Sequence, residues 1–124
     1  MNIGAFIVDD EEDIRTLMRI IIDAADHGLF VAGEASDGEE ALDRMEEVDP
    51  EVIVIDEKMP GMTGVETATL ILKRRPGQRI ILCSAFLDSE LKERAEAAGI
   101  RVCVPKGEVG RIPDTVRELV GDVA

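Results

Sequence analysis

Short apolar runs alternate with amphipathic stretches along the whole chain. The runs lack the apolar–polar alternation of a half-exposed strand, so they predict strands of a parallel sheet covered on both faces. The predicted strands are Ile3–Val8, Leu29–Ala32, Val52–Ile55, Ile80–Cys83 and Val102–Val104. Repeated alternation of strand and helix predicts an α/β domain whose crossover connections are right-handed.

The stretches between these runs repeat apolar residues at helical spacing. The stripe of the first consists of Ile14, Leu17, Met18, Ile21, Ile22 and Ala25. We expect Gly28 to end this helix. Asp37 and Glu40 have the spacing of a capping box and predict the start of the second helix, which Pro50 stops. Thr63 and Glu66 predict the start of the third in the same way.

Two further helices are predicted in the last third of the chain. The fourth runs from about residue 88 to 98 with a weak stripe of Leu91, Ala95 and Ala98, and Gly99 ends it. The fifth begins near Pro113, although the glycines at 107 and 110 leave its start open. Its predicted buried side chains are Val116, Leu119, Val120 and Val123.

Composition narrows the class of protein. A chain of 124 residues with 45% apolar and 33% charged residues predicts one globular domain. The net charge of −13 argues against direct nucleic-acid contact, which needs clustered basic residues. No apolar run approaches the roughly 18 residues of a membrane span, and the N-terminus lacks a basic signal region, so we expect a cytoplasmic protein without membrane insertion. Cys83 and Cys103 lie in apolar runs and are expected to be small buried hydrophobes.

Polar residues gather where the predicted strands end. The first strand is followed by Asp9 and Asp10, the third by Asp56, the fourth by Ser84 and the fifth by Lys106. In an open parallel sheet, ligands bind beyond the carboxyl ends of the strands, where the strand order reverses. With strand order 2-1-3-4-5, all these side chains share one crevice.

Each of these residues also has an ordinary explanation. Acids after the first strand favour the N-terminus of a helix, Asp56 could begin a turn, and Lys106 could be a solvated surface lysine. The combination is what argues for a site, because crowded carboxylates repel one another by about 1–4 kcal/mol per pair. One lysine cannot offset them. Oxygen ligands suit Mg²⁺, so the sequence predicts a magnesium site that also accepts an anion.

Four motifs together resemble the receiver domains of bacterial two-component response regulators, over the full length of the chain. They are FIVDDEED, VIVIDEKMPGMTG, LCSA and VPK. The resemblance implies one receiver domain over residues 1–124, with a flavodoxin-like (βα)5 doubly wound five-stranded parallel sheet of order 2-1-3-4-5. It also implies a signalling phosphoprotein that is not an enzyme, beyond weak autophosphatase activity.

The resemblance assigns roles residue by residue. Asp56 would accept a phosphoryl group from a sensor histidine kinase, a phosphotransfer protein or a small phosphodonor. Asp9, Asp10, Asp56 and the backbone carbonyl of Lys58 would bind Mg²⁺. Lys106 would neutralise the phosphoryl oxygens, and the Ser84 hydroxyl would donate to one of them. The resulting switch would act on a downstream effector or output domain, and the domain could form a homodimer.

Two positions depart from the family's pattern, and the stretch GEVGRI before the last helix is long and contains two glycines. Cys103 stands where the family usually has Tyr or Phe, and Gly107 follows the lysine where the family usually has Pro. Phe86 is a candidate substitute for the missing aromatic, although it could simply pack. Lys58 and Phe86 would flank the phosphoryl group, and we hypothesise that Phe86 excludes hydrolytic water and prolongs its lifetime.

Three other readings remain open. A flavin-binding flavodoxin-like protein needs a hydroxyl- and glycine-rich phosphate loop after the first strand, where this chain has five acids. An aspartate-nucleophile phosphohydrolase needs an Asp two residues after the nucleophile, where this chain has Lys58. A receiver-like scaffold that binds partners without phosphorylation stays possible because of the altered switch positions.

Overall fold

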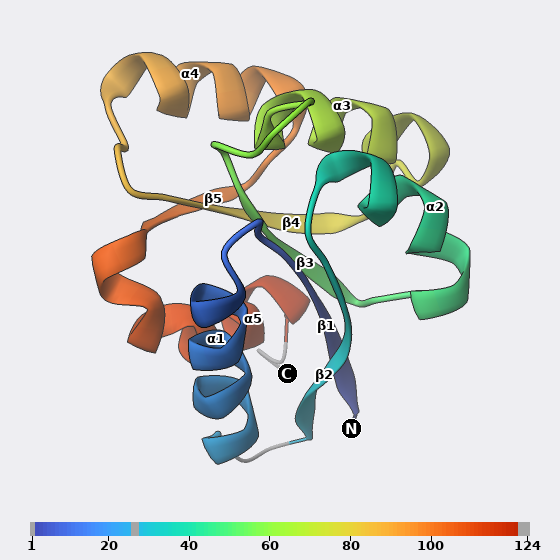
Figure 1. The fold of residues 1–124 in the computed structure, drawn as a ribbon, viewed down its shortest axis with the longest axis vertical. Coiled ribbons are helices and arrows are strands. Elements are labelled where there is room, and N and C mark those ends of the chain that lie inside the picture. The colour runs from blue at the N-terminus through green and yellow to red at the C-terminus, as the bar shows by residue number, and fades with distance from the viewer. Residues whose placement is uncertain (1, 26–27, 122–124) are drawn as a thin grey trace.

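The computed structural model of the protein describes residues 2–25 and 28–121 (Figure 1). Within them, five parallel strands form one sheet of order β2-β1-β3-β4-β5. The strands are β1 (Ile3–Val8), β2 (Leu29–Ala35), β3 (Val52–Asp56), β4 (Arg79–Ser84) and β5 (Val102–Pro105). The helices are α1 (Glu12–Ala24), α2 (Gly38–Val48), α3 (Gly64–Arg74), α4 (Ser89–Ala98) and α5 (Ile112–Val120), with a 3₁₀ helix η1 (Lys106–Arg111). The predicted fold class and strand order are confirmed.

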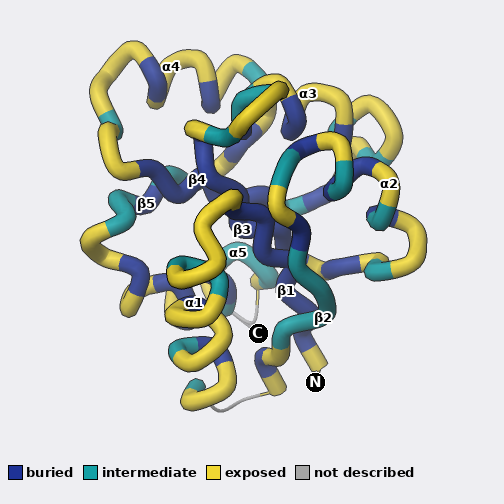
Figure 2. Tube along the Cα trace, viewed as in Figure 1, coloured by how far each residue is buried: buried dark blue, intermediate teal, exposed yellow. Residues whose placement is uncertain are grey.

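Helices cover both faces of the sheet. Helices α1 and α5 lie on one face, and α2, α3 and α4 lie on the other (Figure 1). Successive residues of β1 face opposite layers: Phe6 packs in the cluster under α2 to α4, and Ile7 packs in the cluster under α1 and α5. The central strands are therefore buried throughout (Figure 2). This two-sided cover is why the apolar runs show no alternation.

The edge strand β2 is longer than its apolar run predicts. It continues to Ala35 rather than ending at Ala32, because Gly33 and Glu34 still pair with β1. Both residues are half-buried. An edge strand has one side without a neighbouring strand, so it accommodates polar residues that a central strand would exclude.

One predicted helix end is wrong. Helix α1 ends at Ala24 with an extended cap residue, Ala25, and not at Gly28. Gly28 instead has a φ of 83° at the start of β2, and its carbonyl accepts a hydrogen bond of 2.8 Å from the Ile3 N–H. The glycine therefore serves the turn that aligns β2 with β1, because the left-handed region costs glycine little.

The two predicted capping boxes differ. In α3 the box is complete, with Thr63 accepting from the Glu66 N–H and the Glu66 carboxylate accepting from the Thr63 N–H. In α2 the Asp37 carboxylate accepts from the Glu40 N–H at 2.8 Å. The Glu40 carboxylate, however, accepts from Ser36, whose N–H and hydroxyl both point at it. The second half of the predicted box is therefore wrong, because Ser36 offers two donors.

The last two helices begin and end close to prediction. Helix α4 has Asp88 as N-cap and ends before Gly99, whose φ is 100°. Helix α5 begins at Ile112. The stretch before it, in which two glycines left the helix start undetermined, forms the 3₁₀ helix η1. No helix within residues 2–25 and 28–121 is long and apolar enough to cross a membrane.

The predicted stripes of these two helices are only partly buried. Leu91 and Ala95 of α4 are buried, whereas Ala98 is half-buried. In α5, Val116 is buried, but Leu119 and Val120 are half-buried. The position of Val123 lies outside the described residues.

Helix α3 starts in direct contact with the tip of β3. A Cβ atom on Gly64 would lie 2.4 Å from the carbonyl oxygen of Asp56 and 2.9 Å from Cδ1 of Leu82. The Gly64 N–H also donates to the Glu57 carbonyl at 2.9 Å. Only glycine allows this approach, so Gly64 determines how closely the helix supports Asp56.

We predict that Gly64→Ala destabilises the fold, because the added methyl group has to push α3 away from β3. Such overpacking costs about 1–3 kcal/mol, to be measured as the free energy of urea unfolding. Gly77→Ala is the matched control, since its Cβ would meet nothing within 4 Å. A loss of stability in Gly77→Ala equal to that in Gly64→Ala would contradict this explanation.

Candidate functional site

β3 ends in a buried carboxylate. Asp56 is the last residue of β3, pairs with Cys83 of β4, and is only 4% exposed. The backbone on both sides of it is held, by the sheet before it and by the close contact with Gly64 after it. The side chain therefore projects from a rigid support, which is the placement that a reacting group needs.

The ammonium of Lys106 contacts acids at the ends of two strands. Its Nζ lies 3.1 Å from Asp56 Oδ2, 3.2 Å from Asp9 Oδ2 and 3.3 Å from Glu11 Oε1. The lysine side chain is 14% exposed. The structure thus brings together Asp9, Asp56 and Lys106 beyond the carboxyl ends of the strands, as the strand order predicts.

Asp9 is the most deeply buried of these acids, at 1% exposed. Its N–H donates to the Ala35 carbonyl at 3.1 Å, and its Oδ1 accepts from the Glu11 N–H at 2.9 Å. Its Oδ2 has the ion contact with Lys106 but no hydrogen-bond partner among the residues that the structure describes. A buried oxygen left in this state calls for a further partner.

The acids after β1 suit a divalent cation. One carboxylate oxygen from each of Asp9, Asp10 and Glu11 lies within 4.8 Å of the others, and Asp10 and Glu11 are exposed to solvent. Asp56 is outside this group and meets Asp9 through Lys106. Carboxylate oxygens together with open coordination positions for water are the donor set that Mg²⁺ prefers. The residues present therefore fit the predicted ion.

Burial and crowding disturb the titration of these groups. Burial, followed by the charge of Asp9, raises the pKa of Asp56 from 3.8 to about 6, although Lys106 acts in the opposite direction. Burial also raises the pKa of Asp9. Burial alone would lower the pKa of Lys106, but its contacts with Asp56 and Asp9 outweigh this and raise it. The single ammonium does not fully offset the crowded acids.

The hydroxyl of Ser84 is turned into its own loop. It donates to the Phe86 carbonyl at 3.1 Å, and the Phe86 N–H donates back to Oγ at 3.3 Å. Ser84 is buried, whereas Phe86 is 81% exposed. The Phe86 side chain is therefore largely exposed to solvent.

A cleft of about 570 Å³ opens above these groups. Its lining comes from the loops after β1, β3, β4 and β5 and from the start of α4: Asp10, Glu11, Asp56, Glu57, Lys58, Thr63, Ser84, Ala85, Phe86, Asp88, Glu90, Leu91, Arg94 and Lys106. Lys58 and Phe86, which are predicted to flank the phosphoryl group, are both among them. Cys103 is not among them; it is half-buried, not fully buried as predicted, and packs against the core cluster beneath α4. The volume is in the range of small-molecule sites.

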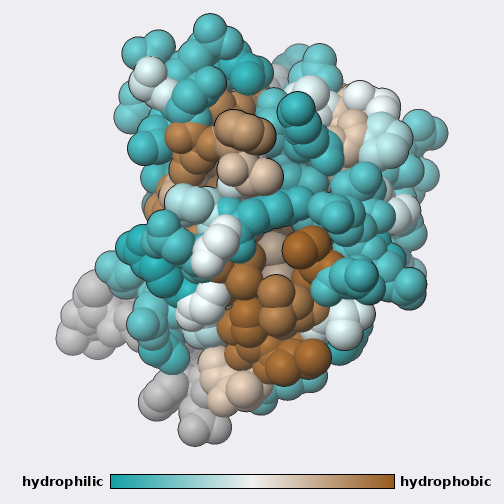
Figure 3. Space-filling view, turned by 60° about the vertical axis from the view of Figure 1, so that its left-hand side comes forward, coloured by the Kyte–Doolittle hydropathy of each residue, from teal (hydrophilic) through white to brown (hydrophobic). Residues whose placement is uncertain are grey.

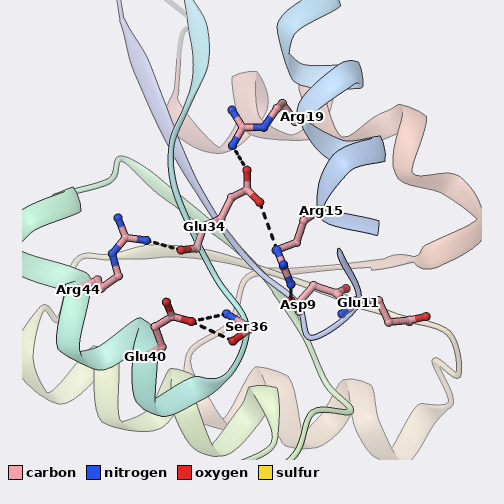
Figure 4. A network of polar contacts seen from close by, with 8 residues as sticks. All are labelled: Asp9, Glu11, Arg15, Arg19, Glu34, Ser36, Glu40 and Arg44. Carbon is pink, nitrogen blue, oxygen red and sulfur yellow. Dashed lines mark hydrogen bonds and ion pairs between the residues drawn. The ribbon is translucent and has the colours of Figure 1, made fainter. Parts of the chain in front are cut away.

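Sequence reasoning missed two ion pairs, one that lines the cleft and one beside Asp9. Glu57 is buried, its Oε1 accepts from the Val65 N–H at 2.9 Å, and its Oε2 lies 3.7 Å from Nη1 of Arg94. Arg15 of α1 contacts both the Asp9 carbonyl and the carboxylate of Glu34 (Figure 4). No sequence motif predicts either ion pair, because the two partners of each pair lie on different elements.

Comparison with known proteins identifies the family of the chain. The family model for the response regulator receiver domain matches residues 5–117. The chemotaxis protein CheY of Thermotoga maritima is 36% identical over 106 residues, covering 86% of this chain and 87% of that protein. The response regulator GacA of Pseudomonas aeruginosa is 31% identical over 106 residues, and the matched region is 49% of its length. The chain thus spans about half of GacA.

Solved structures show the same fold. The response regulator domain of Thermotoga maritima CheB superposes with a TM-score of 0.89 at 26% identity, covering 97% of both chains. A two-component response regulator of the LuxR family from Aurantimonas sp. SI85-9A1 gives a TM-score of 0.91 at 25% identity, covering 97% of this chain and 86% of that one. The chain therefore belongs to the receiver domains of the two-component response regulators.

Proposed function

We propose that Asp56 is the phosphoacceptor of this receiver domain. The observation that carries the proposal is a buried carboxylate on a rigid strand end, 3.1 Å from a lysine ammonium and open to a cleft. A carboxylate oxygen of Asp56 would form a bond to phosphorus while the bond from phosphorus to the donor breaks. With a phosphohistidine donor, the imidazole nitrogen leaves with the electron pair of that bond.

The neighbouring groups would offset the charge of the transferring phosphoryl group. Lys106 already contacts Asp56 and would donate to a phosphoryl oxygen. Asp9, Asp10, Asp56 and the Lys58 carbonyl would hold Mg²⁺, which supplies further positive charge when bound. Asp9 Oδ2, whose one contact among the described residues is the ion contact with Lys106, and the exposed side chain of Asp10 support this ligand set.

We assign the switching step to Ser84. Its hydroxyl bonds the backbone of Phe86 in this structure, and a phosphoryl oxygen on Asp56 would be a stronger, charged acceptor. Exchange of that partner would draw the loop after β4 inward and change the surface of α4 and β5. Shielding of the phosphoryl group by Phe86 would need its side chain, which is 81% exposed at the edge of the cleft, to move over Asp56. Cys103 lacks the aromatic ring that the family usually places there.

The partners that we propose are proteins: a sensor histidine kinase or phosphotransfer protein as donor, and an effector or output domain as receiver of the signal. Two apolar patches separated by hydrophilic residues lie on one side of the molecule (Figure 3). Leu17 and Ile20 of α1 are 42% and 59% exposed. Exposed apolar patches are typical of protein-binding surfaces. With these partners we propose a cytoplasmic domain that accepts a phosphoryl group on itself and has at most weak autophosphatase activity.

We predict that acetyl phosphate with Mg²⁺ adds one phosphoryl group to the protein, detected by intact mass. Asp56→Asn should abolish the added mass, because the amide is not a nucleophile. Asp43→Asn is the control, since this exposed Asp of α2 lies outside the cleft and should leave the modification unchanged. An unmodified wild-type protein would favour the scaffold reading, and a phosphorylated Asn variant would place the acceptor elsewhere.

We further predict that Asp56→Asn stabilises the metal-free protein at neutral pH. The folded-state pKa of Asp56 is about 6, above its ordinary value of 3.8, so the folded protein holds this proton more tightly than the unfolded chain. Stability is therefore lost as pH rises from about 4 to 6. A shift of this size corresponds to roughly 2–3 kcal/mol.

The test is urea unfolding in EDTA at pH 8 and pH 4.5. The advantage of the Asn variant over wild type should be large at pH 8 and should shrink at pH 4.5. If Asp56→Asn is the less stable protein at pH 8, the contact with Lys106 outweighs burial and crowding, and the explanation is wrong.

A further inference from the structure

Asp9 is held at every polar atom except one. Its N–H and Oδ1 are occupied by Ala35 and Glu11. Its carbonyl oxygen accepts a hydrogen bond of 2.6 Å from Nη1 of Arg15. Only Oδ2 is left without a hydrogen bond among the described residues, and it faces Lys106. The direction of this one oxygen is therefore set by contacts elsewhere on the same residue.

Arg15 is in turn held by the edge of the sheet. Its Nε donates to Glu34 Oε1 at 3.2 Å, and the side chains of Arg15 and Glu34 are only 17% and 23% exposed. Glu34 pairs with Ile7 of β1 through the strand register, and its backbone carbonyl accepts from Arg44 (Figure 4). The Arg15 guanidinium, which extends from α1, thus links Glu34 of β2 to Asp9, the residue that follows β1.

We propose that Arg15 is a positioning residue for the acidic site, acting through the Asp9 carbonyl to hold Oδ2 toward the cation. The inference rests on the proposed Mg²⁺-dependent function. A planar guanidinium can donate to the Asp9 carbonyl and to Glu34 at the same time. Groups behind the direct ligands commonly determine metal affinity in this way, by fixing the ligand's orientation.

Arg19 offers an internal comparison. It lies one turn further along α1 and forms an ion pair with the same Glu34 carboxylate. It is 50% exposed, and in the described part of the chain it has no hydrogen bond or ion pair with Asp9. If Glu34 merely anchors α1 to β2, loss of either arginine should have similar consequences. If Arg15 positions Asp9, only the loss of Arg15 should weaken Mg²⁺ binding.

The experiment is a Mg²⁺ titration of the unphosphorylated full chain, followed by the NMR shift of the Glu11 amide, whose N–H bonds Asp9 Oδ1. We expect Arg15→Gln to raise the Mg²⁺ dissociation constant about 10- to 100-fold. Arg15→Lys should give a smaller loss, because one ammonium cannot reproduce both contacts. Arg19→Gln should stay within about twofold of wild type, since an exposed pair contributes little.

Urea unfolding of the same variants separates positioning from general support. The inference is supported if Arg15→Gln loses Mg²⁺ affinity under conditions in which it is folded, far below its urea unfolding midpoint. Arg19→Gln should keep its affinity under the same conditions. Wild-type affinity in Arg15→Gln, or an equal loss in both variants, overturns it. If Arg15→Gln does not fold, Arg15→Lys decides on the same criterion. A wild-type protein that binds no Mg²⁺ defeats the proposed function itself, whatever the variants do.

Discussion

The contact of one lysine with two buried carboxylates governs the arrangement of this domain. Lys106 meets Asp9 and Asp56 at 3.2 and 3.1 Å, in surroundings where only a few per cent of either acid is exposed. Without a counter-charge, two such acids would repel each other and resist burial. The pKa of Asp56 is nevertheless raised to about 6, so the lysine compensates only in part. This residual negative charge suits a site that recruits a dication.

Close packing makes that electrostatic arrangement precise. β3 is buried along its whole length, and α3 begins against its tip because Gly64 carries no side chain. On the other side, Asp9 is bound by β2, by the turn at Glu11 and by Arg15. The backbone of each acid is therefore tied to at least two elements. Rigidity of this kind keeps the like-charged side chains at a fixed separation, as the proposed binding of a cation and a phosphoryl group requires.

Local pattern was sufficient for much of the fold and failed at particular residues. The helix start at Thr63 was predictable, because a capping box depends on residues three positions apart, and the start near Asp88 followed from the apolar stripe of α4. The end of α1 at Ala24 was not, since Gly28 serves the pairing of β2. The length of β2 and the partner of Glu40 were missed for the same reason: both depend on which neighbours the fold supplies.

The sequence by itself determined the strands, their parallel arrangement and the residue types at the strand ends, because periodicity and strand-end chemistry are properties of contiguous residues. Asp9, Asp56 and Lys106 could be expected to meet once the strand order was inferred. Only the tertiary structure decided that Ser84 bonds its own loop and that Phe86 faces solvent. It alone revealed the link from Glu34 through Arg15 to Asp9, because a contact between three elements depends on their distances in space and leaves no periodic trace in the chain.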